Sequence, residues 1–175
     1  LPGLSYRNPE APAGFTSTAP ANFNKDLNEL SSPFLDGTFD GVLEEYGEHI
    51  TGALWETNRG CPFTCTFCVQ GDAIFKRVLT FETSRLYQEL EWMSARRIEY
   101  IFATDANFGI KERDLSIAEK IAQLKLAQGY PRFFMVNWMK NSSAKILRTA
   151  EALSRGGIPA RMTLSRQSFS EETLE

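Results

Sequence analysis

Two patterns of apolar and polar residues alternate along the chain from His49 onward. Short runs rich in apolar and β-favouring residues predict four strands. These runs cover residues 49–57, 98–105, 132–139 and 160–167. Between them apolar residues recur at helical spacing, which predicts helices over 83–97, 114–129 and 142–157, with another beginning at 170.

The predicted helices each have one apolar stripe and recognisable ends. The residues expected to face the core are Leu86, Leu90 and Met93, then Ile117, Ile121 and Leu124, then Ile146, Ala150 and Leu153. Asp114 is the candidate N-cap of the second helix, and Gly129 stands where that helix would stop. The pair Gly156 and Gly157 marks the end of the third.

Alternating strands and helices are typical of a parallel sheet built from right-handed βαβ units. Both a doubly wound sheet and a (β/α) barrel fit this order. No Gly-x-Gly-x-x-Gly follows the first strand, which disfavours a dinucleotide-binding fold. Four strands are too few to close a barrel. We therefore predict an α/β fold, a partial (β/α) TIM-type barrel of about four strand–helix units, cut in its fourth helix.

Residues 1–48 differ from the rest of the chain because they lack any sustained period. They hold five of the eight prolines, Pro2, Pro9, Pro12, Pro20 and Pro33. We expect an irregular linker or extension here, and a core domain over 49–175. Within the extension, either Phe34, Leu35 and Phe39 dock on a neighbouring surface or the stretch is a plain surface loop.

Composition narrows the class of protein. The chain has 175 residues, of which 42% are hydrophobic and 23% charged, as in one soluble domain. No apolar run is long enough to span a membrane, and the first residues lack the apolar core of a signal peptide. Because the chain begins at Leu1, we expect an excised piece. A net charge of −3 without a basic cluster argues against a nucleic-acid partner.

All three cysteines lie within eight residues, as Cys61-x3-Cys65-x2-Cys68. An odd number of close cysteines is a poor disulfide framework, so we expect a reducing, cytoplasmic location. They follow the first strand, at the end of the strands where both candidate architectures place their chemistry. Thiolates bind zinc, copper(I) or iron–sulfur clusters.

The alternatives to an iron–sulfur cluster each leave something unexplained. Structural zinc needs four ligands, and the lone histidine, His49, lies at the far end of the preceding strand. A thioredoxin-like Cys65-x2-Cys68 motif gives Cys61 no role. Three thiolates on a [4Fe–4S] cluster satisfy three irons and leave the fourth open to a substrate or cofactor.

A Cys-x3-Cys-x2-Cys loop after the first strand of a βα barrel resembles the radical SAM superfamily. The resemblance implies that Cys61, Cys65 and Cys68 hold a [4Fe–4S] cluster whose open iron chelates S-adenosylmethionine (SAM). One electron, from a donor such as flavodoxin or ferredoxin, then releases a 5′-deoxyadenosyl radical that abstracts hydrogen from a substrate. Phe67 matches an aromatic position that approaches the adenine, although a core aromatic covering the cluster fits the same place.

Two further stretches match the family in part. "FATDANFG" lies where members commonly have a Gly-Gly-Glu-like segment that holds the SAM ammonium, and this chain has Ala103-Thr104-Asp105 instead. The Asp105 carboxylate then either binds the ammonium or caps the following turn. "SRQSFSEETL" resembles a stretch that would bring Gln167 to the SAM ribose or carboxylate, with Ser165 beside it, although Ser168 and Glu171 also fit a helix capping box.

The branch of the superfamily is indicated by several short stretches. "DANF", which contains Asn107, and "ETNRGCPFTCTFC" resemble radical SAM proteins with an N-terminal cobalamin-binding domain. "LPGLSYR" and "SSPFLDG" resemble the linker after that domain. The resemblance implies a radical SAM enzyme acting on an unknown substrate, with cobalamin-dependent methylation through a domain absent here. Two alternatives stay open: a methylthiotransferase, for which basic RNA-binding appendages are missing, and a non-catalytic iron–sulfur electron-carrier module.

Overall fold

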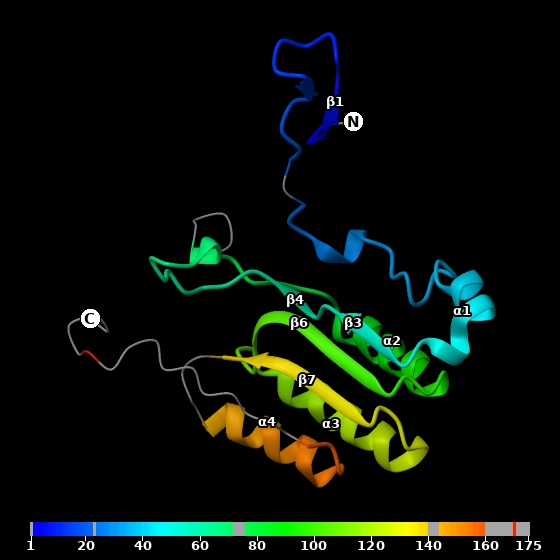
Figure 1. Cartoon of the computed structure of the whole chain (residues 1–175). Coiled ribbons are helices and arrows are strands. Elements are labelled where there is room, and N and C mark those ends of the chain that lie inside the picture. The colour runs from blue at the N-terminus through cyan, green and yellow to red at the C-terminus, as the bar shows by residue number, and fades with distance from the viewer. Residues whose placement is uncertain (1, 23, 72–75, 140–143, 160–169, 171–175) are drawn as a thin grey trace.

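A computed structural model describes residues 2–22, 24–71, 76–139, 144–159 and 170 (Figure 1). The fourth predicted strand, at 160–167, lies outside the described residues, as do Ser165 and Gln167 and all of the helix predicted from 170 except its first residue.

A parallel three-stranded sheet forms the centre of the fold. Its strands are β3 (Gly52–Trp55), β6 (Tyr100–Phe108) and β7 (Phe133–Trp138), in the order β3-β6-β7. Tyr100 pairs with Gly52 on one side and with Phe133 on the other. The three strands predicted within the described residues and their parallel pairing are therefore confirmed. β6 runs three residues further than predicted, to Phe108, with a register shift against β7 after Ala103.

Three helices cover one face of this sheet: α2 (Thr83–Ala95), α3 (Arg113–Gln128) and α4 (Ala144–Arg155). Each of α2 and α3 follows one strand and leads to the next parallel strand, so the predicted βαβ units are present (Figure 1). Every residue predicted to face the core from these helices is buried. The apolar stripes pack against Ile101, Ala103 and Phe134 of the sheet within a single core cluster.

The ends of α3 confirm one prediction and correct another. Gly129 adopts a left-handed conformation (φ 84°) and ends the helix as predicted. The N-cap prediction was wrong, because the helix begins at Arg113 and Asp114 lies in its first turn. The Asp114 carboxylate instead reaches back and accepts the backbone N–H groups of Gly109 and Lys111, both at 2.9 Å. It thus fixes the loop that leads into the helix.

The other face of the sheet carries exposed apolar side chains. Successive residues of a strand point to opposite faces, so Leu54 points away from the helices that bury Trp55. Leu54 is 72% exposed, and Met135 on the same face is 50% exposed. Tyr100 and Phe133 stack there with their ring centroids 4.8 Å apart. Within the described residues, this face is open.

The N-terminal extension contains more structure than the sequence predicts. Strands β1 (Ser5–Arg7) and β2 (Phe15–Ser17) form an antiparallel hairpin that stands off the body of the protein (Figure 1). Strands of three residues are too short to show a period of two, so the pattern did not reveal them. Further along lie the 3-10 turns η1 (Leu27–Glu29) and η2 (Gly47–His49) and the helix α1 (Asp40–Tyr46). No described helix has both the length and the apolar character needed to cross a membrane.

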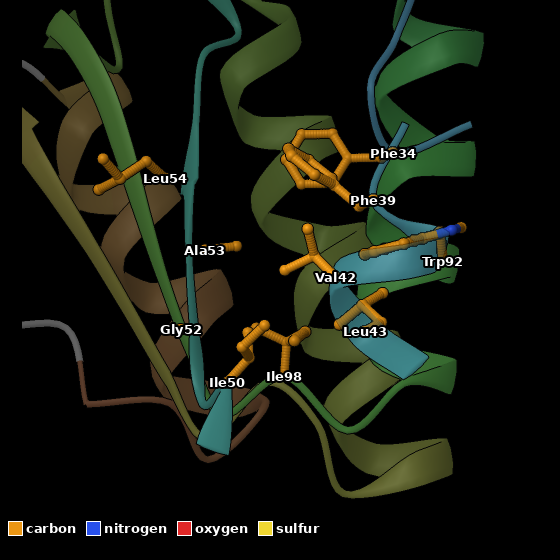
Figure 2. A pocket seen from close by; sticks show the side chains of 10 residues that line it. All are labelled: Phe34, Phe39, Val42, Leu43, Ile50, Gly52, Ala53, Leu54, Trp92 and Ile98. Atoms are coloured by element: carbon orange, nitrogen blue, oxygen red, sulfur yellow. The ribbon is translucent and has the colours of Figure 1, made fainter. Parts of the chain in front are cut away.

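The second half of this extension docks on α2. Phe34 and Phe39 lie with their ring centroids 5.5 and 6.5 Å from that of Trp92, whereas Leu35 is 41% exposed. Of the three predicted docking residues, two therefore make the contact. The rings border an apolar hollow of about 260 Å³ between α1, β3 and α2 (Figure 2). Its walls also include Val42, Leu43, Ile50, Ala53, Leu54 and Ile98.

Candidate functional site

The cysteine loop, residues 60–78, starts and ends at the same place in the fold, between two short paired strands. Strands β4 (Asn58–Arg59) and β5 (Leu79–Thr80) pair antiparallel and close its base. Beside them the Phe81 N–H donates to the Thr57 carbonyl at 3.2 Å. The sequence predicted a loop at the carboxyl end of β3 but not this short ladder, because two-residue strands carry no readable pattern.

The three cysteines are reduced, without a disulfide between them, and they have different surroundings. Cys61 is buried, and Cys65 and Cys68 are half-buried. The Cys68 N–H donates to the Cys65 carbonyl at 3.1 Å, which closes a four-residue turn. Three soft donors in one loop suit an iron–sulfur cluster in their chemistry. Within the described ranges, however, no three Cys, His, Asp or Glu side chains already converge on a point that could hold a metal ion.

Asn107, at the end of β6, contacts the cysteine loop directly. Its side-chain Nδ2 donates to the Cys61 sulfur at 3.1 Å, and the residue is almost fully buried. Its Oδ1 atom is buried without a hydrogen-bond partner in the described structure. An N–H donor aimed at a thiolate stabilises the charge that cluster binding requires. The predicted assignment of Asn107 to the cofactor site is compatible with this geometry and stays a prediction.

Asp105 is 1% exposed and faces Thr57 and Asn58, the two residues that form the lead-in to the cysteine loop. Its carboxylate accepts the backbone N–H groups of Thr57 at 2.7 Å and Asn58 at 3.1 Å. It also accepts the Asn58 side-chain amide at 2.8 Å and the Thr57 hydroxyl. Burial raises the pKa of Asp105 above its ordinary value, and the hydrogen bonds from Thr57 and Asn58 act against that rise. Asp105 therefore caps backbone N–H groups of the preceding loop, at Thr57 and Asn58, and not those of the turn that follows it.

Arg113, in the first turn of α3, binds the base of the cysteine loop from the side of the helix. Its guanidinium donates to the carbonyls of Phe81 at 2.6 Å and Thr57 at 2.5 Å, which are the two ends of the loop base. Sequence reasoning missed this residue, because an arginine in the first turn of a helix is ordinarily solvated and nothing in the sequence distinguishes it. It likewise missed Thr57 and Asn58, since the motif drew attention only to the cysteines.

The open face of the sheet presents exposed polar side chains, unlike the buried contacts of Asp105. Thr104 is exposed there and donates its hydroxyl to the Trp55 carbonyl at 3.2 Å, while Ala103 is buried toward the helices. Asn137, which the sequence analysis did not single out, is also exposed and donates to the Asp105 backbone carbonyl at 3.3 Å. Phe67 is 69% exposed, so it is not a core residue.

No protein-family model matches the chain. Two curated proteins do. The 2-(S-pantetheinyl)-carbapenam-3-carboxylate methyltransferase of Streptantibioticus cattleyicolor is 37% identical over 178 residues, covering 100% of this chain and 26% of that protein. The cobalamin-dependent radical SAM methyltransferase TokK of Streptomyces tokunonensis is 39% identical over 151 residues, covering 85% and 22%. The chain thus spans about a quarter of the length of these relatives.

Solved structures of the radical S-adenosylmethionine methyltransferase TsrM from Kitasatospora setae share the fold. One, with tryptophan substrate and a SAM analogue bound, superposes with a TM-score of 0.53 over 66% of this chain and 22% of TsrM, at 22% identity. Another, with cobalamin and a [4Fe–4S] cluster bound, gives a TM-score of 0.51 over 67% and 22%, at 23% identity. At this level of identity the likeness concerns the fold alone.

Proposed function

We propose that the chain belongs to the cobalamin-associated branch of the radical SAM superfamily and is the cluster-binding part of a methyltransferase, because it is 37% and 39% identical to two methyltransferases, one of them a cobalamin-dependent radical SAM enzyme. In this proposal Cys61, Cys65 and Cys68 hold a [4Fe–4S] cluster that cleaves SAM reductively. The observation that carries it is the closed loop of three reduced cysteines at the carboxyl end of β3, in a chain related to two methyltransferases.

The open face of the sheet is the proposed inner wall of a barrel. A doubly wound sheet has helices on both faces. Here α2, α3 and α4 cover one face, and the other exposes Leu54 and Met135. A barrel interior lined by this face would account for the exposed side chains, and this supports the partial (β/α) barrel over the doubly wound alternative.

The residues of the chain have distinct proposed tasks at this site. The thiolates bind three irons, and the cluster when bound supplies an electron and an open iron to SAM. Asn107 orients the Cys61 sulfur and lowers the cost of its negative charge. Thr104 and the backbone carbonyls of Ala103 and its neighbours are the proposed contacts to the SAM ammonium, and Phe67 remains the proposed contact to adenine. Ser165 and Gln167 remain predicted SAM contacts.

Methyl transfer is favoured over the two alternatives by the relatives. Both are named methyltransferases, one of them cobalamin-dependent, and neither is named a methylthiotransferase or an electron carrier. We propose that cobalamin and the substrate are bound mainly by regions that correspond to the remaining length of these relatives. A flavodoxin or ferredoxin as electron donor belongs to the same proposal.

The direct test is anaerobic reconstitution of the protein with iron and sulfide. We expect about four irons and four sulfides per chain, and reductive cleavage of SAM to methionine and 5′-deoxyadenosine by the reduced protein. Replacing any one of the three cysteines by alanine should remove most of the iron. Thr66→Ala, at an exposed position in the same loop, is the matched control and should keep it. Stoichiometric zinc binding in place of iron would overturn the proposal.

A further inference from the structure

We propose that Asp105 is a positioning residue that clamps the lead-in of the cysteine loop, and that its carboxylate does not contact SAM. The inference deepens the proposed function and rests on it, because the loop in question is the one that would hold the cluster. It also departs from the expectation drawn from the family resemblance, in which an acidic side chain at this strand end meets the SAM ammonium.

The hydrogen bonds of Asp105 leave its carboxylate fully engaged. Oδ1 accepts the backbone N–H groups of Thr57 and Asn58, at 2.7 and 3.1 Å. Oδ2 accepts the Asn58 amide at 2.8 Å and the Thr57 hydroxyl. A carboxylate offers about four lone-pair sites, so these four donors saturate it. An ammonium group could bind only by displacing one of them.

The direction of the side chain leads to the same conclusion. Thr104 is exposed on the open face of the sheet, whereas Ala103 and Asp105 on either side of it are buried. Neighbouring residues of a strand point to opposite faces, which places the Asp105 carboxylate away from that open face. A cofactor lying on the open face would therefore meet Thr104 and Asn137, but not this carboxylate.

Arg113 completes the clamp from α3. It binds the carbonyls of Thr57 and Phe81, so it holds both ends of the loop base while Asp105 holds the lead-in. The donors to Asp105 are all neutral, and the positive charge of Arg113 acts to lower its pKa. A buried charge with this arrangement is costly to disturb, because its partners lose their hydrogen bonds together. The clamp therefore fixes where the chain turns toward Cys61.

Three variants test the clamp. Asp105→Asn keeps the shape of the side chain but replaces one acceptor oxygen with an NH2 group. The Asn58 side-chain amide then faces a donor instead of the acceptor that it has in wild type. Thr57→Val removes one hydroxyl donor, and Thr57→Ser restores it. We expect Asp105→Asn and Thr57→Val to release iron to a chelator about tenfold faster than wild type, since a lost buried hydrogen bond is worth roughly a factor of ten. Thr57→Ser should remain close to wild type.

Two further measurements separate the clamp from a SAM contact. In protein that carries a full cluster, the Kd for SAM should change by less than about threefold in all three variants. In cluster-free protein, the backbone amides of Thr57 and Asn58 should exchange with solvent about tenfold faster in Asp105→Asn and Thr57→Val. The amide measurement needs neither iron nor SAM.

The outcomes are distinguishable. If Asp105→Asn weakens SAM binding tenfold or more while iron release and amide exchange at 57 and 58 stay at wild-type rates, Asp105 is a SAM contact and the clamp is wrong. If Asp105→Asn fails to fold, the Thr57→Val and Thr57→Ser pair decides by the same readouts. If wild-type protein binds no iron, the proposed function fails, and amide exchange still supports or overturns the clamp.

Discussion

Two buried carboxylates, Glu89 and Asp105, join distant parts of this chain in different ways. Glu89 lies on α2 and accepts the Trp55 indole N–H at 2.7 Å and the Ser32 hydroxyl at 2.6 Å. It also forms an ion pair with Arg85 at 2.9 Å. Asp105 lies within β6, three residues before its end, and accepts only neutral donors, from Thr57 and Asn58.

The partners of each carboxylate indicate what it holds in place. Glu89 joins the N-terminal extension, α2 and β3 within the scaffold, and the Phe34 and Phe39 rings pack on Trp92 beside it. Asp105 joins β6 to the loop that carries the cysteines. A buried acidic side chain at a strand end is therefore weak grounds for a ligand contact until its hydrogen-bond partners are known. The comparison predicts that the two regions respond separately to substitution.

The largest effect is expected at Glu89. Glu89→Ala leaves the Arg85 charge, the Trp55 indole and the Ser32 hydroxyl without their buried acceptor. Breaking one side of such a pair should lower the free energy of unfolding by about 3–5 kcal/mol. Urea denaturation of the cluster-free protein measures this loss, with Glu119→Ala at an exposed position of α3 as the control. Amide exchange at Thr57 and Asn58 should stay at the wild-type rate under native conditions. A loss below about 1 kcal/mol, as at an exposed ion pair, would contradict the scaffold role.

How far the sequence predicts each region depends on how local its interactions are. Helix periodicity correctly identified Leu86, Ile117 and Ile146 as core residues, because one helical face repeats along the chain itself. The position of the cysteines directly after the first predicted strand likewise located their loop at the carboxyl end of β3. Both follow from residues that are close together in the sequence.

The contacts that shape the site connect residues far apart in the sequence. Thr57 and Asp105 are 48 positions apart, and Arg113 reaches Thr57 across 56. A single sequence contains no periodic signal for such pairs. The prediction for Asp105 rested on its place at the end of a predicted strand. That place is compatible both with a contact to SAM and with a clamp on the cysteine loop. Only the direction of the side chain and its partners separate them.

A smaller effect is expected at Asn107, which touches the loop through one sulfur. Asn107→Leu keeps a similar volume, removes the N–H···S bond to Cys61, and also removes the buried Oδ1 atom that lacks a partner. Stability should change by less than about 1 kcal/mol, because an unsatisfied acceptor disappears together with the bond. The midpoint potential of the reconstituted cluster should fall by about 20–60 mV, the equivalent of one hydrogen bond for a one-electron couple.

The sign of that shift follows from charge. Reduction adds an electron to the cluster, so an N–H donor at a ligand sulfur stabilises the reduced form and raises the potential. Redox titration monitored by electron paramagnetic resonance measures it, with Thr66→Ala as the control in the same loop. An unchanged potential in Asn107→Leu would show that the amide does not contact the sulfur in the loaded protein.

The smallest effect concerns a third buried carboxylate, Asp114, which has free acceptor capacity where Asp105 has none. Its Oδ2 accepts two backbone N–H groups, and its Oδ1 is buried without a hydrogen bond in the described structure, 4.0 Å from the Arg113 Nε. Burial raises the pKa of Asp114 above its ordinary 3.8. As the pH rises from 3.8 to the raised value, the folded protein holds more protons than the unfolded chain. Its free energy of unfolding therefore falls with rising pH in that window, by at most about 1.4 kcal/mol per pH unit from this group.

Asp114→Asn keeps an oxygen for both backbone donors but cannot ionise, so it should lose this slope and stay within about 1 kcal/mol of wild type at neutral pH. Urea denaturation of the cluster-free protein between about pH 4 and pH 8 measures the pH slope and the neutral-pH value of the free energy of unfolding. Subtracting the wild-type free energy from that of the variant at each pH cancels the titration of all other groups. We expect that difference to shift in favour of the variant as the pH rises through the window and then to level off. A difference that moves toward wild type instead would mean that the Gly109 and Lys111 amides stabilise the charged carboxylate more than burial disfavours it.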